Sequence, residues 1–159
     1  MLLRRFARIL FAAPFIQQGT DAVMHPSDHA ATARPLIDSI TDKVGIDPLS
    51  DAQLRTAVRV HGGLTAVLGT TLALGIFPRI SSLKLAALTA PLVALNQPFT
   101  VKGKTEDAKA ERAEKTAKFA QSLGLVGAAL IAGADLEGRP GVKWRVNAAR
   151  EARAANLEQ

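Results

Sequence analysis

Six polar side chains within or beside long apolar segments are the groups of this sequence best placed to do chemistry. Polar groups inside a membrane are costly, and a charged side chain at the centre of a membrane helix costs about 2.5–3.5 kcal/mol, so each of these residues marks a candidate functional position. Their depths in the predicted helices agree, which would bring them together in the outer half of a helix bundle. The six candidates are Gln18, Asp21, Arg59, His61, Asn96 and Gln121.

This polar cluster admits two main interpretations. An ion pair between Asp21 and Arg59 would neutralise both charges, and the simpler interpretation is a structural network that fixes the register of the helices. The other interpretation is a pocket for a quinone or a similar small molecule, in which His61 or Gln18 would donate a hydrogen bond to a carbonyl oxygen.

The histidines suggest two weaker hypotheses. His25 and His61 are the minimum for haem ligation, and His25, Asp28 and His29 form an H-x-x-D-H pattern that could bind a metal ion. Both patterns have low specificity, and we predict no metal site and no cofactor held by the chain alone. The sequence contains no Gly-rich phosphate loop, nucleophile elbow or paired-carboxylate motif, so we also predict no independent catalysis.

The elements that must position these residues are long apolar segments. Residues 60–78 carry no formal charge, and about 20 such residues form a helix that crosses a hydrocarbon layer of about 30 Å. Residues 85–101 and 119–134 are further uncharged segments. The N-terminal segment resembles a secretory signal, but no small-x-small cleavage site follows it, which favours a retained helix.

We therefore predict an all-α, integral membrane four-helix bundle over residues 1–141, followed by a short basic tail at 142–159. Two extramembrane segments are expected: a proline-containing loop at 25–50 with one short amphipathic helix, Pro35 to Val44, and a charged segment at 102–118. The four membrane helices are expected at about 3–24, 51–77, 81–98 and 105–135, with Ser50 capping the second of them and the last one beginning in water near Thr105.

Two rows of small residues predict tight packing between these helices. Thr65, Gly69 and Ala73 recur every four residues, and a second row comprises Ala120, Gly124, Ala128 and Ala132. Small residues at this spacing let the backbones of membrane helices approach closely. In the charged segment before the second row, Glu111 with Lys115 and Glu114 with Lys118 are favourable i,i+4 pairs.

The basic charge of the chain bears on its partners and its orientation. The net charge is +6, and the basic residues lack the interleaved aromatic side chains of single-strand nucleic-acid binders, so we expect a membrane surface and no nucleic acid. The 20 Lys and Arg residues divide evenly between the two sides of a four-span chain. Three arginines at the start of the first helix favour both termini in the cytoplasm.

Several segments resemble the DoxX-like family of small four-helix membrane proteins, of the actinobacterial type. The glycine-rich segment 58–88, with its turn Gly75-Ile76-Phe77-Pro78-Arg79, is similar to the second helix of that family. Residues 4–23 resemble its first helix, 118–123 the start of its fourth, and 135–141 its closing turn. The resemblance implies a membrane protein linked to a quinone reductase or to a membrane oxidoreductase complex.

These observations together predict a multi-pass cell-membrane protein that anchors or organises an oxidoreductase or respiratory complex. Its partners would be the lipid bilayer and other membrane or redox-complex subunits. The alternative is a quinone-linked oxidoreductase subunit with a small-molecule pocket in the outer half of the bundle.

Overall fold

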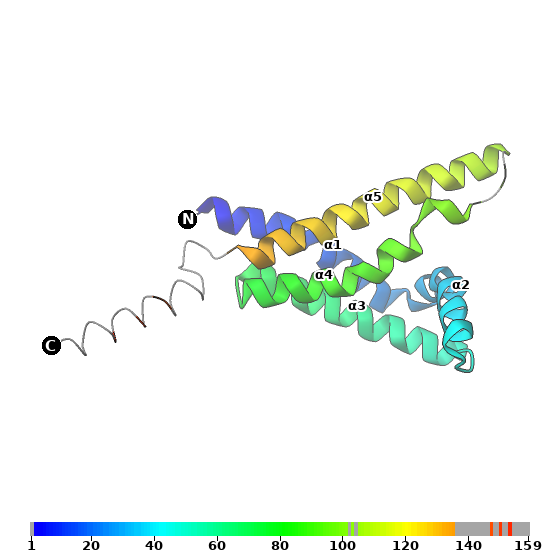
Figure 1. The fold of residues 1–159 in the computed structure, drawn as a ribbon, viewed down its shortest axis with the longest axis horizontal. Coiled ribbons are helices and arrows are strands. Elements are labelled where there is room, and N and C mark those ends of the chain that lie inside the picture. The colour runs from blue at the N-terminus through cyan, green and yellow to red at the C-terminus, as the bar shows by residue number, and fades with distance from the viewer. Residues whose placement is uncertain are drawn as a thin grey trace.

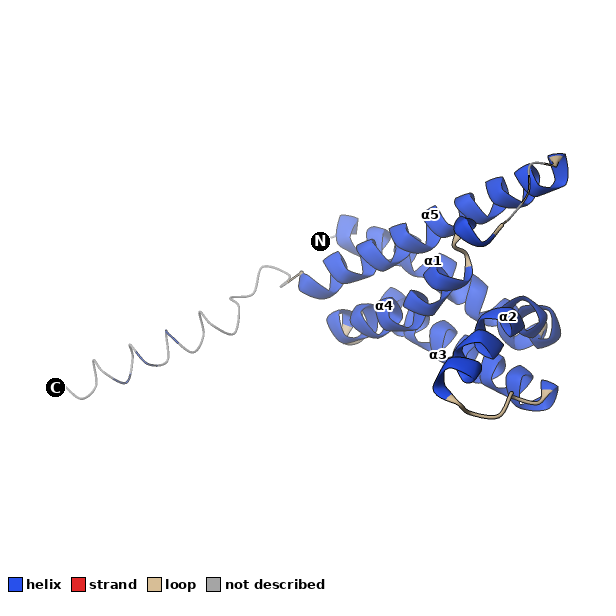
Figure 2. Cartoon of the chain, turned by 45° about the vertical axis from the view of Figure 1, so that its right-hand side comes forward, coloured by secondary structure: helices blue, strands red, loops and turns tan. Residues whose placement is uncertain are grey.

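The computed structural model describes residues 2–101, 103, 105–135, 147, 150 and 153, and all of its regular elements are helical (Figures 1 and 2). All of the predicted closing turn at 135–141 except Asp135, and nearly all of the predicted tail at 142–159, lie outside the described residues. The elements are α1 (Leu2–Met24), α2 (Pro26–Val44), α3 (Asp51–Leu74), α4 (Pro78–Leu95), the 3-10 turn η1 (Pro98–Thr100) and α5 (Glu106–Ala134).

Local capping sets most of the helix ends. The hydroxyl of Ser50 accepts from the backbone N–H of Gln53, whose side chain accepts in turn from the N–H of Ser50, so the predicted cap of α3 is confirmed. Gly75, with a φ of 75°, ends α3 before the predicted residue 77. Pro78 then occupies the first turn of α4, which begins before the predicted residue 81.

The segment expected to be mostly loop contains the 19-residue helix α2, so the prediction of one short helix at Pro35–Val44 was wrong. The described residues hold five α-helices, which equals in number the predicted four long helices and one shorter helix, and the all-α class is confirmed. Pro26 lies in the first turn of α2, where a missing N–H costs nothing. Arg34 joins α2 to the start of α3, since its guanidinium donates to the carbonyl of Leu49 at 2.7 Å and contacts the Asp51 carboxylate.

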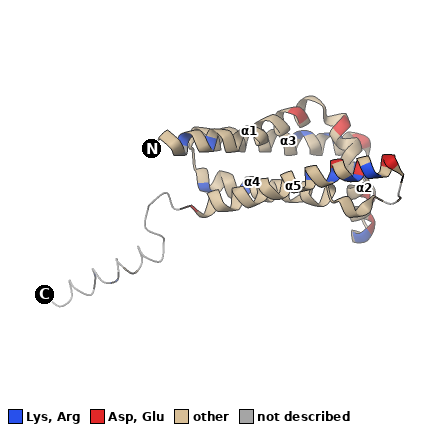
Figure 3. Cartoon of the chain, turned by 90° about the horizontal axis from the view of Figure 1, so that it is seen from above, with Lys and Arg blue, Asp and Glu red and all other residues tan. Residues whose placement is uncertain are grey.

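The four long helices form two antiparallel pairs, α1 with α3 and α4 with α5 (Figure 3). The first residues of α1, the α3–α4 turn and the last residues of α5 lie at one end, and α2 lies at the other (Figure 1). One buried core joins the two pairs. It comprises Ala12 and Phe15 of α1, Leu72 of α3, Leu85 and Ala86 of α4, and Ala129 of α5.

Helices α1 and α3 approach each other at backbone distance because glycines line their contact. A Cβ atom added to Gly19 would lie 2.5 Å from the Gly62 carbonyl oxygen and from the Ala66 nitrogen of α3. At Gly69 an added Cβ would lie 2.9 Å from Cγ1 of Ile16. The predicted packing of the α3 small-residue row is therefore confirmed.

The predicted small-residue row on α5 does not pack in the same way as the row on α3. Gly124 is exposed, and an added Cβ there would meet nothing within 4 Å. Ala120 is exposed as well, so these two positions of the predicted row pack against no other part of the described chain. Helix α5 instead contacts α4 through its opposite face, where Ser122, Ala129 and Gly133 are buried.

Helices α3 and α5 are long and apolar enough to cross a membrane, and only 22% and 17% of their most apolar stretches are buried. Large apolar side chains are exposed on all four long helices. Examples are Leu10 at 73%, Val67 at 61%, Leu83 at 48% and Ile131 at 75%.

Candidate functional site

The most concentrated polar cluster among the described residues lies where α1 meets α2. Helix α1 ends at Met24 and α2 begins at Pro26, so His25 stands between them as the cap of α2. The N–H of His25 donates to the carbonyl of Asp21 at 2.7 Å, which continues the α1 turn through the junction. This geometry places Asp21, His25 and His29 together.

The Asp21 carboxylate is held between two imidazoles. Nδ1 of His25 lies 2.9 Å from Oδ1, and Nε2 of His29 lies 2.8 Å from Oδ2. Each ring uses a different nitrogen for this bond, which leaves Nε2 of His25 and Nδ1 of His29 for another partner. All three side chains are partly accessible, with exposed fractions of 57% for His25, 54% for Asp21 and 40% for His29.

The histidines also set the charge state of this carboxyl group. Hydrogen bonds from His29 and then from His25 lower the pKa of Asp21 below its usual 3.8, because both favour the ionised form. Asp21 lies in the last turn of α1, beyond the apolar segment that ends at Ile16 and the polar residues Gln17 and Gln18. The cluster can therefore hold a carboxylate and two imidazoles in fixed tautomers at the edge of the apolar region.

The structure gives Asp21 these histidine partners in place of the predicted Arg59. The side chain of Arg59 is exposed and pairs with no carboxylate among the described residues. Gln18 and His61 are half-buried, and the His61 carbonyl accepts from the hydroxyl of Thr65 at 2.8 Å.

The other two candidates belong to the α4–α5 pair. Nδ2 of Asn96, at the end of α4, donates to Oγ of Ser122 on α5 at 3.1 Å. The Ser122 hydroxyl itself donates to the Lys118 carbonyl at 2.8 Å. Gln121 is exposed. Between the described residues, no hydrogen bond or ion pair joins these two candidates to the group on α1 and α3.

This geometry does not support the two weaker hypotheses, haem ligation by two histidines and a metal site in the H-x-x-D-H pattern. Within the described part of the chain, no three His, Asp or Glu side chains are arranged to hold a metal ion. Asp28 accepts from Ser27 at 3.3 Å rather than joining His25 and His29. A shallow groove of about 540 Å³ lies on α5 and a smaller one lies on α3, and none of the six candidates lines either of these two grooves.

The sequence held a signal for the Asp21 cluster that the prediction did not use. Asp21, His25 and His29 are spaced by four residues, which places them on one face if the helix continues. Residues 25–34 were expected to be a loop, so this spacing was not applied to them.

Comparison with known proteins adds no relative to this description. The chain matches no family model, no curated protein and no solved structure. The resemblance to the DoxX-like family therefore stays a prediction from the sequence motifs.

Proposed function

We propose that this chain is a small integral membrane subunit that crosses the bilayer with α1, α3, α4 and α5 and organises other membrane proteins, without catalysis of its own. The observation that carries the proposal is the exposure of the apolar helices. A core helix of a soluble protein is mostly buried, whereas only 22% and 17% of the apolar stretches of α3 and α5 are buried.

The distribution of charge supports helices that cross the bilayer from one end of the bundle to the other. Figure 3 shows the charged residues mostly near the two ends of the helix pairs. The end that holds the start of α1 and the α3–α4 turn carries Arg5, Arg8 and Arg79. The basic residues divide evenly between the two ends, so the arginines at the start of the first helix decide the orientation, and this end and the N-terminus are assigned to the cytoplasm.

The role as an organising subunit rests on the parts that project from the apolar region. The N-terminal half of α5 is charged, and it is held by η1, since Arg112 donates to the Val101 carbonyl at 2.9 Å and Phe119 contacts the Phe99 ring. The six polar candidates line neither the α5 groove nor the α3 groove, so these two grooves do not support the alternative of a quinone pocket. We instead assign the six polar residues to a structural role, which is to fix the register of the helices.

A single charge on the exposed apolar surface tests the membrane assignment. Val67→Asp places a carboxylate at an exposed position in the middle of α3. In a bilayer this change costs about 2.5–3.5 kcal/mol, so we expect a strong loss of protein from the membrane fraction after an alkaline carbonate wash.

Ile46→Asp is the matched control, because Ile46 is equally apolar and 59% exposed but lies in the loop between α2 and α3. It should behave as the unchanged protein does. Recovery of the unchanged protein in the supernatant, or equal behaviour of the two variants, would refute the membrane assignment.

Co-purification in a mild detergent tests the organising role. Native mass spectrometry of the extracted protein should show companion subunits bound to the chain. A membrane-embedded chain that is recovered with no companion protein would contradict this role.

A further inference from the structure

Helix α5 presents a continuous face that no other part of the described chain covers. It lies opposite the side that packs on α4, and an added Cβ at either Gly124 or Gly127 would meet nothing within 4 Å. Ile131 on the same face is 75% exposed. The face comprises Ala110, Ala113, Ala117, Ala120, Gly124, Gly127 and Ile131, and we call it the α5 seam.

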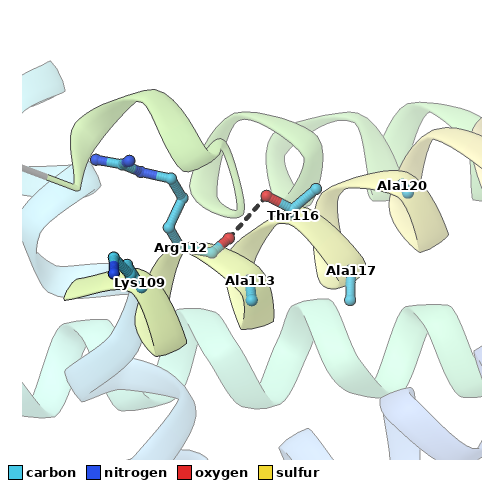
Figure 4. A pocket seen from close by; sticks show the side chains of 6 residues that line it. All are labelled: Lys109, Arg112, Ala113, Thr116, Ala117 and Ala120. Atoms are coloured by element: carbon cyan, nitrogen blue, oxygen red, sulfur yellow. Dashed lines mark hydrogen bonds between the residues drawn. The ribbon is translucent and has the colours of Figure 1, made fainter. Parts of the chain in front are cut away.

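The water-side half of the seam forms the shallow groove of about 540 Å³ (Figure 4). Ala113, Ala117 and Ala120 line it, with Lys109 at its N-terminal end. The hydroxyl of Thr116, beside this row, donates to the Arg112 carbonyl at 2.7 Å and so stays on its own helix. The groove is therefore shallow because short side chains leave the backbone of α5 uncovered.

The spacing of the seam specifies how another helix would fit it. From Ala113 to Ile131 the intervals alternate between four and three residues, which is a seven-residue repeat. A straight helix drifts from such a repeat, so the repeat matches two helices wound around each other with a left-handed supercoil. Alanine and glycine at the seam allow the close approach that membrane helices need.

The residues beside the seam identify the partner by charge. In a parallel pair of helices, the residue just before Ala110 or Ala117 on one helix faces a residue of the other helix whose number is larger by five. Lys109 would then face Glu114 of a second copy, and Thr116 would face Gln121 of that copy. Opposite charges and two hydrogen-bonding side chains thus meet when the chain pairs with itself.

Both charged side chains are free to exchange partners. Lys109 lies 2.6 Å from Glu106, and Glu114 lies 2.6 Å from Lys118, but the Lys109 and Glu114 side chains are 61% and 65% exposed. We propose that α5 pairs in parallel with α5 of a second copy of this chain through the α5 seam. The parallel direction rests on the proposed membrane function, because two copies inserted the same way up are related by an axis along the membrane normal.

Cysteine cross-linking tests this pairing in native membranes, since the chain contains no cysteine of its own. Single variants Ala117→Cys and Gly124→Cys should form a disulfide-linked dimer on mild oxidation. Lys118→Cys is the matched control, because it is exposed on the adjacent turn but lies off the seam, and it should stay monomeric. An added Cβ at Gly124 meets nothing, so the fold of that variant is retained.

Two further positions test the direction of pairing. Ala113→Cys and Gly127→Cys lie at opposite ends of the seam, and both should cross-link if the helices are parallel. In an antiparallel pair only positions near the crossing point would do so. Adducts of another mass would mean that a different membrane protein occupies the seam, and equal cross-linking of Lys118→Cys would mean random collision. Each of these results overturns the proposal.

Charge exchange gives an independent test. Lys109→Glu alone and Glu114→Lys alone would each place like charges across the pair, and each should weaken self-association about tenfold. A mixture of the two variants restores opposite charges at both contacts and should dimerise as the unchanged chain does. A mixture no stronger than either variant would refute the pairing, while Val67→Asp would still report separately on membrane insertion.

Discussion

The α1–α3 contact and the α5 seam are built from the same small residues but differ in what lies against them. At Gly19 an added Cβ would lie 2.5 Å from backbone atoms of α3, whereas at Gly124 it would meet nothing within 4 Å. The first surface is closed within the chain and the second is open. Small-residue spacing therefore reveals a surface able to pack closely, and only the fold reveals whether the chain supplies its own partner.

The largest expected effect comes from filling the closed surface. In Gly62→Ala the new methyl group would lie 2.8 Å from both the Ala22 Cβ and the Gly19 carbonyl oxygen. The helices would have to move apart, so the free energy of unfolding in detergent should fall by about 2–3 kcal/mol.

Gly63→Ala is the matched control on the adjacent residue. Its nearest neighbour would be Cγ2 of Val23 at an ordinary 3.9 Å, so the change should be below about 1 kcal/mol. Equal losses in the two variants would show that α1 and α3 do not meet at backbone distance.

A smaller effect is expected where α5 meets α4 through side chains rather than glycines. Asn96→Ala removes the donor to Ser122 and should lower the unfolding free energy by about 0.5–1.5 kcal/mol. Gln97→Ala is its control, because the Gln97 side chain makes no hydrogen bond to the described residues. A loss no greater for Asn96→Ala than for Gln97→Ala would contradict the assigned contact.

The Asp21 cluster is expected to make the stability of the protein depend on pH. Because the folded pKa of Asp21 is lowered, its contribution to stability is present above pH 3.8 and is lost as the pH falls through the lowered value. Thermal unfolding of Asp21→Asn and of the unchanged protein should therefore differ at pH 6 and converge below pH 3.8. A difference that persists unchanged to the lowest pH would argue against ionic bonding to the histidines.

The smallest effect is expected on the open surface. Gly124→Ala adds a methyl group that meets nothing, so at a dilution where the chain is monomeric its stability should rise by at most about 1 kcal/mol. A destabilisation comparable to that of Gly62→Ala would mean that Gly124 is covered within the chain, which would remove the contrast between the two surfaces.

Most of the helices could be predicted from local signals. The caps at Ser50 and Thr105 come from the side chains themselves, and the i,i+4 pair of Glu111 with Lys115 forms at 3.1 Å as predicted. The second half of α2 was predicted, but its first half at 26–34 was taken as loop. Arg34 bonds to the loop that leads into α3, and Pro35 inside the helix resembles a loop signal in the sequence.

The candidate site was predicted less well for the same reason. The sequence identified Asp21 as a polar residue that needs a partner, but its partners His25 and His29 lie at the junction with the first half of α2, which was predicted as loop. Asn96 was correctly singled out as polar, yet its partner Ser122 has no distinctive sequence signal. A helix register can be read from spacing, whereas the pairing of two distant helices depends on the whole fold.

The length of α5 has a practical consequence for locating neighbouring proteins. Its 29 residues span about 43 Å, about 13 Å more than the hydrocarbon layer. In the proposed membrane arrangement, this excess would raise the α4–α5 connection above the lipid headgroups on a helical support. A fluorescent protein inserted at the exposed Gly103 would then report energy-transfer distances to any subunit bound on that side, without touching the four long helices.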